Sequence, residues 1–238
     1  MEVALPPQPP PDVDAPPPGP EARRSRWKMR AIIIFGLLCA GPGLIGSLIA
    51  PHYFKVQKKV NYSYASTNVR QICNQLFEFD AVHGKFPDAT TIGSVQAKTS
   101  TTLPLGSATS NDLFRQLFAS GKATEKMFFA KSPTCSDPGD EILGANTLAK
   151  GECGFTYIAG LSSSSAPATP VAMAPVIPGT WKFDPKPFGD KAVVLRCDGS
   201  AKLEPIDKHG HVMIGGMNLF DPRQPYWGGK VPDIKWPE

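Results

Sequence analysis

Residues 31–50 read AIIIFGLLCAGPGLIGSLIA, twenty consecutive residues without a charge. At 1.5 Å of rise per residue, a helix of this length spans about 30 Å, the thickness of the hydrocarbon core of a bilayer. Five basic residues precede the run between residues 21 and 30, and three lysines follow it between residues 55 and 59. This basic excess predicts a single transmembrane helix at 31–51 with its N-terminal side in the cytoplasm.

The chain begins with a proline-rich stretch, MEVALPPQPPPDVDAPPPGP at 1–20, which lacks the apolar residues of a core. Such a composition favours extended polyproline II conformations, so residues 1–30 are predicted to be a disordered cytoplasmic arm with a basic juxtamembrane end. We interpret the arm as a flexible spacer, with a docking tail for a proline-binding partner as the alternative. A cleaved signal peptide is the alternative to the anchor, but the long arm and Pro51 disfavour it.

Residues 52–83, which contain neither glycine nor proline, are predicted to form a stem helix. Their apolar residues recur at i, i+3, i+4 and i+7, the spacing of one face of an amphipathic helix. The residues in this pattern are Val69, Ile72, Cys73 and Leu76. Gly84 is a natural stop, and Pro87 prevents easy continuation of the helix. We expect the anchor and the stem to form one long helix that enters a head at 84–238.

The first half of the head reads as loops around one short helix. Residues 88–109 are rich in Ser, Thr and Gly and predict a loop. Ser110-Asn111-Asp112 then offers an N-cap to a helix that ends at Gly121. Residues 127–129 predict a short buried segment, and 137–150 an exposed loop.

The second half of the head reads as sheet. Alternation around 155–157 predicts one strand, and 171–177 predicts another, at a sheet edge because it contains Pro175. Residues 192–197 and 200–204 predict a hairpin, whose Asp-Gly turn we assign to type I′. A last short strand is expected at 211–214, and the tail at 219–238 is expected to be coil. The predicted fold class is therefore α+β, with a long N-terminal helix packed on a small antiparallel sheet.

This order of elements resembles type IV pilin-like proteins, the pseudopilins grouped with type II secretion protein G. The similar segments cover much of the exported part, and the last resembles the hairpin of pilin-like heads in planctomycete and verrucomicrobial bacteria. They read NVRQICNQLFEFDAVHGKFPD at 68–88, SNDLFRQLFASGKATEKMFFA at 110–130, GFTYIAGLS at 154–162 and KAVVLRCDGSAKLEP at 191–205. Family members carry Gly-Phe-Thr-Leu-Ile-Glu where the prepilin peptidase cuts, whereas residues 30–35 here read RAIIIF. This departure from the family motif predicts an uncleaved, permanently anchored relative of the pseudopilins.

Four cysteines fall in the exported part: Cys73, Cys135, Cys153 and Cys197. An even number in an oxidising compartment predicts two disulfides, although four cysteines allow three connectivities. We favour a Cys135–Cys153 bond and a Cys73–Cys197 bond between stem and sheet. The first would close the loop between its two cysteines and stabilise the folded state by about 3 kcal/mol. A zinc site is the alternative, but no CxxC or close Cys/His spacing is present.

Two further groups of residues resemble metal ligands. His209 and His211 lie at i and i+2 and would need a third ligand, so we interpret them as a loop entering a strand. Asp137, Asp140 and Glu141 are similar to the calcium loop of some secretion pseudopilins. Their spacing fits no EF-hand, and we interpret them as a solvated acidic turn. We therefore predict no metal and no cofactor.

The remaining composition argues against two classes of protein. The net charge of +4 is modest and its surplus lies beside the anchor, so we predict no nucleic-acid partner. No P-loop, Rossmann glycine pattern, nucleophile elbow or HExxH is present, and nothing marks a base near the serines at 162–165, so we predict no enzyme.

The apolar run and its basic flanks predict a membrane protein with one span, and the resemblance to pseudopilins implies that the membrane is the bacterial inner membrane and that the C-terminal domain is periplasmic. We expect it to act as a structural pseudopilin-type protein that associates with other pilin-like or secretion-apparatus proteins. The alternative is a membrane-tethered module whose head binds a polysaccharide or an envelope protein. Four aromatic residues support that alternative because exposed rings stack on sugars: Trp181, Tyr226, Trp227 and Trp236.

Overall fold

The computed structural model describes the backbone of residues 20–121, 123–135, 139–141 and 143–238, and the side chains from residue 52 onward within these ranges. Residues 1–19 of the predicted arm, and the side chains of the rest of the arm and of the predicted anchor at 31–51, lie outside the described residues. Among the described residues, no helix is both long and apolar enough to cross a membrane. The chain divides into two compact units, Met1–Tyr53 and Phe54–Glu238, and the second contains the sheet.

Helix α1 (Pro20–His83) ends where the sequence predicted, at the residue before Gly84. Gly84 has φ of +80°, a left-handed conformation that glycine adopts without strain and that terminates a helix. The start of the helix differs from the prediction, because residues 20–30 are helical and were expected to be disordered. From Ala65 onward, one face of α1 is buried at the spacing that the sequence predicted. The buried residues are Ala65, Val69, Ile72, Cys73, Leu76 and Phe79.

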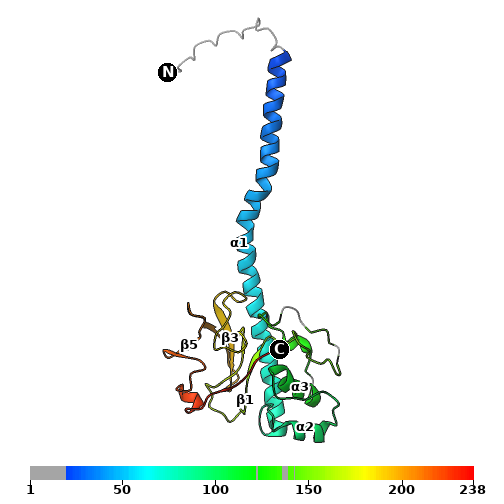
Figure 1. Cartoon of the computed structure of the whole chain (residues 1–238), viewed down its shortest axis with the longest axis vertical. Coiled ribbons are helices and arrows are strands. Elements are labelled where there is room, and N and C mark those ends of the chain that lie inside the picture. Colours follow the sequence, from blue (N-terminus) through cyan, green and yellow to red (C-terminus); the bar gives the residue numbers. More distant parts are fainter. Residues whose placement is uncertain (1–19, 122, 136–138, 142) are drawn as a thin grey trace, which may run out of the picture. The chain divides into compact units, whose positions relative to one another are not determined.

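The main sheet has five antiparallel strands in the order β4-β3-β2-β1-β7. Their bounds are β1 (Thr156–Ala159), β2 (Pro170–Ala174), β3 (Lys191–Arg196), β4 (Ala201–Pro205) and β7 (Asp233–Lys235). A separate two-stranded ribbon pairs β5 (Met213–Ile214) with β6 (Met217–Asn218). Helix and antiparallel sheet together confirm the predicted α+β class. In Figure 1 the strands lie on one side of the lower part of α1, and α2 and α3 lie on the other.

The sheet separates two apolar cores because successive side chains of a strand point to opposite faces. One core joins the buried face of α1 to alternate strand residues such as Tyr157, Val193 and Leu195. The other lies on the far face, where Ile158, Met173 and Val194 pack under the C-terminal segment. Strands β1 and β2 are consequently buried along their whole length. This arrangement fixes which face of α1 is covered.

The first half of the head contains more helix than the sequence predicted. The expected loop at 88–109 includes α2 (Ile92–Thr99), whose apolar pattern is too sparse to read. Helix α3 (Ser110–Ser120) is capped by Thr109, one residue before the predicted cap, through a capping box with Asp112. The expected buried segment is the 3-10 helix η1 (Glu125–Phe128). The loop at 137–150 is only partly exposed, since Thr147 and Leu148 are fully buried.

Three predictions about the sheet were wrong in detail. Strand β2 is central, because Pro175 lies just beyond its end and interrupts no pairing. The tail includes β7, an edge strand paired with β1, and the 3-10 helix η2 (Pro225–Trp227). The β3–β4 hairpin has a three-residue loop, in which the Gly199 N–H donates to Arg196 O and the Arg196 N–H to Ser200 O. Gly199 alone has positive φ there, so the turn is not type I′.

Candidate functional site

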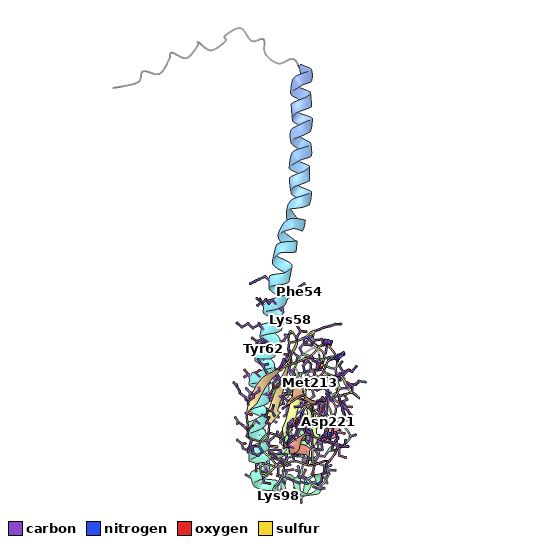
Figure 2. All side chains as sticks on the ribbon, turned by 90° about the vertical axis from the view of Figure 1, so that its left-hand side faces the viewer. Phe54, Lys58, Tyr62, Lys98, Met213 and Asp221 are labelled. Carbon is purple, nitrogen blue, oxygen red and sulfur yellow. The ribbon has the colours of Figure 1, made fainter. Side chains whose placement is uncertain are left out.

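The part of α1 that precedes its buried face carries an exposed apolar stripe. Val56, Val60 and Tyr64 are 43%, 39% and 59% exposed, although valine is among the side chains that are most often buried. They are spaced four residues apart, so at 100° per residue they occupy a sector of about 80° on one side of the helix. The opposite side leads into the buried face that begins at Ala65. Figure 2 shows Phe54, Lys58 and Tyr62 following one another along this part of α1.

Polar contacts from the head set the rotation of α1 and hence which face is exposed. The Asn61 Nδ2 donates to Pro187 O at 3.2 Å, and the Asn68 Nδ2 donates to Lys126 O and Phe129 O at 3.0 and 2.8 Å. The Lys191 ammonium lies 5.5 Å from the centre of the Tyr62 ring, within the range of a cation–π contact. One set of contacts comes from the segment around 187–191 and the other from the segment around 126–129, so two separate parts of the head hold the helix. The stripe therefore cannot turn inward without breaking them.

A second candidate site is a cluster of three carboxylates from separate segments: Glu125, Asp140 and Glu152 each offer an oxygen, and the three lie within 4.8 Å of one another. Glu125 is fully buried and accepts the N–H groups of Leu148 and Glu141 at 2.7 and 2.6 Å. Burial raises the pKa of Glu125, and the nearby Glu152 and Asp140 charges raise it further, against the lowering effect of the backbone N–H groups.

Such a cluster is chemically suited to a hard divalent cation, which prefers carboxylate oxygens. Of the predicted acidic turn, only Asp140 belongs to the cluster, and Asp137 lies outside the described residues. The Glu141 carboxylate instead accepts the backbone N–H groups of Glu125 and Lys126. The sequence could not identify Glu125 and Glu152, because they lie far from the acidic run and carry no motif of their own.

The two histidines are not brought to a third ligand. In the described part of the chain, the only group of three potential metal ligands is the carboxylate cluster, which contains neither histidine. The backbone N–H groups of His209 and His211 both donate to an oxygen of Asp207, each at 2.8 Å. Asp207 thus anchors the turn that precedes β5.

Cys73, Cys135, Cys153 and Cys197 are all buried thiols, and none of these four described residues is in a disulfide. The two bonds expected from the sequence are therefore not formed in this structure. The Cys153 Sγ lies 3.6 Å from Phe155 O and 3.7 Å from the Ser110 hydroxyl. Burial, opposed by these hydrogen bonds, raises the pKa of Cys153 to about 12, so the group is a neutral thiol at physiological pH.

On the far face of the sheet lies an open, largely apolar cavity of about 460 Å³. Pro167, Ile214 and Pro225 line it together with Tyr226, while Arg196 is engaged with Glu204 at 2.7 Å. Among the predicted aromatics, Trp227 is buried and donates its Nε1 hydrogen to Leu219 O, and Trp236 is partly buried. In this cavity a predicted sugar-stacking residue, Tyr226, lines a hollow of ligand size.

Comparison with known proteins does not extend this picture. No family model, no curated protein and no solved structure matches the chain. The resemblance to pseudopilins stays a prediction drawn from the sequence. We therefore infer the function from the geometry of the exposed stripe, the carboxylate cluster and the cavity.

Proposed function

We propose that the protein is a membrane-anchored, pseudopilin-type structural protein of a secretion or pilus-like envelope assembly, and that it acts by association and not by catalysis. In this proposal residues 31–51 span the bacterial inner membrane once, with the N-terminus cytoplasmic and the head periplasmic. The observation that supports it best is the two-faced α1, whose Val69–Leu76 side is buried under the sheet while the stripe of Val56, Val60 and Tyr64 is exposed.

The width of the stripe favours a helix of another subunit as its partner. A face that packs against a broad apolar surface is typically 100° wide or more, whereas the seam of a two-helix contact is narrower. The stripe covers about 80°, and its residues recur at the spacing of ridges that fit the grooves of a neighbouring helix. A single helix of a pilin-like partner would cover Val56, Val60 and Tyr64 together.

Photo-crosslinking in membranes tests this association. A photoreactive phenylalanine analogue would replace Val60 or Tyr64, one at a time, in the full chain. Lys55 is the matched control, because it is also exposed on α1 but lies about 100° or more around the axis from each stripe residue. We expect protein adducts from positions 60 and 64 and none from position 55. Adducts to lipid alone, or monomer at every position, would contradict the proposal.

A second candidate function is a tethered module whose head binds a polysaccharide or an envelope protein. The cavity beside Tyr226 favours it, since an aromatic ring and a nearby polar pair are common features of sugar-binding sites. Quenching of tryptophan fluorescence by a soluble oligosaccharide would test it, with Tyr226→Ala as the variant that should lose the response. Unchanged fluorescence at millimolar sugar would argue against this function.

A further inference from the structure

Two of the buried thiols, Cys73 and Cys197, lie on the elements that pack together where α1 passes beneath the β3–β4 hairpin. Cys73 lies on the buried face of α1, and Cys197 is the first residue of the hairpin loop. A Cβ placed on Gly199, two residues further along this loop, would lie 3.6 Å from the Cys73 Sγ. The loop is tight, because the Gly199 N–H donates to Arg196 O at 3.0 Å. The Cys73 sulfur therefore lies directly against the turn that carries Cys197.

The electrostatics of the thiols agree with this placement. Burial raises the pKa of Cys197 to about 12, against a hydrogen bond with Ser165, and negative charges on Asp198 and Cys73 raise it further. The pKa of Cys153 responds in the same way to Cys135. The position of the Cys73 sulfur against the loop of Cys197 favours the connectivity that pairs these two cysteines, which leaves Cys135 to pair with Cys153.

We propose that Cys73 and Cys197 form a disulfide when the chain folds in the presence of a disulfide oxidant, and that the bond does not form once the hairpin has packed on α1. The modification would tie the stem helix covalently to the sheet. This inference concerns the folded head and does not depend on the proposed association.

The reaction is a thiol–disulfide exchange with a disulfide RSSR, such as oxidised glutathione or the disulfide of an oxidoreductase. One cysteine thiolate attacks RSSR, forms a mixed disulfide and releases RS⁻. The second cysteine thiolate attacks the protein sulfur of that mixed disulfide and releases the second RS⁻. The two cysteines lose two electrons and two protons, and RSSR becomes two RSH.

The packed core blocks the first of these steps. Cys73 is 6% exposed and Cys197 is 2% exposed. RSSR therefore cannot approach either sulfur along the axis of the S–S bond that has to break. At a given pH, a thiol of pKa about 12 has a far smaller thiolate fraction than an ordinary thiol of pKa about 8.5. Its thiolate is intrinsically more nucleophilic, but this offsets only part of the deficit in thiolate. The remaining deficit is roughly 50-fold at pH 8, before access is counted. Whether Cys73 and Cys197 become oxidised is therefore decided during folding, before the hairpin packs on α1.

Peptide mapping of the full chain tests both parts of the proposal. Chain unfolded and reduced in denaturant is refolded in a mixture of oxidised and reduced glutathione, and a second sample is folded reduced before it meets the same mixture. Acid quenching, alkylation and trypsin would release the bond as linked peptides 71–85 and 197–202. We expect this pair to dominate in the first sample and to appear at least thirtyfold more slowly in the second.

Two variants separate pairing from folding. Cys135→Ser should leave the 71–85/197–202 pair intact, and Cys73→Ser should remove it and leave Cys197 open to alkylation in denaturant. Absence of the pair after oxidative refolding of the unmodified chain, or a link from Cys73 to Cys135 or Cys153, would overturn the connectivity. Equal rates in the two samples would overturn the claim that packing blocks the reaction. Both results can be read from the unmodified chain if a variant fails to fold.

Discussion

Replacement of Gly154 by alanine should destabilise the head strongly, although the change adds a single methyl group. Gly154 precedes β1, and its N–H donates to Phe128 O at 3.0 Å. A Cβ at this position would lie 1.9 Å from the carbonyl oxygen of Ala130, and 2.7 and 2.8 Å from its carbonyl carbon and its nitrogen. All three atoms belong to the backbone, so no side chain can move aside to make room.

The size of the effect follows from the distance that the two segments must separate. Carbon and carbonyl oxygen atoms approach comfortably to about 3.3 Å, so the contact has to lengthen by more than about 1 Å. That displacement breaks the hydrogen bond to Phe128 and leaves a buried polar group unpaired, at a cost of about 1–3 kcal/mol. Overpacking of the surrounding core adds about 1–3 kcal/mol. The expected loss is about 2–6 kcal/mol, a large part of the stability of an ordinary domain.

Urea unfolding of the full chain in detergent, followed by tryptophan fluorescence, measures this loss. Gly93→Ala is the matched control, because Gly93 lies in α2 and a Cβ there meets nothing within 4 Å. The control should raise the free energy of unfolding by up to about 1 kcal/mol, since alanine is the better helix former. A Gly154→Ala variant within about 1 kcal/mol of the unmodified protein would refute the steric reasoning.

Three further substitutions should lower the free energy of unfolding in the same assay, and a fourth, at an exposed position, serves as a control. Ile72→Ala, on the buried face of α1, should cost about 2–5 kcal/mol, whereas Val82→Ala at an exposed position should cost less than about 0.5 kcal/mol. Thr109→Ala, which removes the capping box of α3, should cost about 1 kcal/mol, and an unchanged midpoint would contradict the role of that cap. Burial opposes ionisation of Asp88, but hydrogen bonds from its neighbours and the ion pair with Lys85 outweigh it and lower its pKa below that of the unfolded chain. Asp88 therefore stabilises the fold above about pH 4 and loses this contribution as the pH falls further, so Asp88→Asn should be less stable at pH 7 and show a weaker loss on acidification.

The elements that the sequence predicted well are those specified by local patterns. The spacing of Val69, Ile72 and Leu76 reports one face of a helix, and Gly84 marks its end because the left-handed conformation there suits glycine. The β3–β4 hairpin was found through its Asp-Gly signal. The error over its turn type arose because Gly199 can supply the left-handed residue of a three-residue loop as well as that of a type I′ turn.

The elements that sequence reasoning missed depend on contacts between distant residues. Strand β7 has three residues, and its pairing with β1 is decided by a partner more than seventy residues away. The carboxylate of Glu125 is buried because it satisfies the Leu148 N–H, a contact that no pattern within η1 predicts. The same holds for the carboxylate cluster. Its members come together only through the folding of the loop between η1 and β1.

Helix α1 separates the requirements of folding from those of association, and this separation makes the proposed function testable. The buried face contributes to the core, so changes at Val69 or Ile72 would alter stability and association together. Val60 and Tyr64 are exposed in the isolated chain, and substitutions there remove little buried apolar area. A loss of crosslinks at these positions without a loss of stability can therefore be assigned to a missing partner contact. The Cys73–Cys197 pair lies on the other side of the same helix, so its oxidation should strengthen the attachment of the sheet to α1 and leave the stripe unchanged.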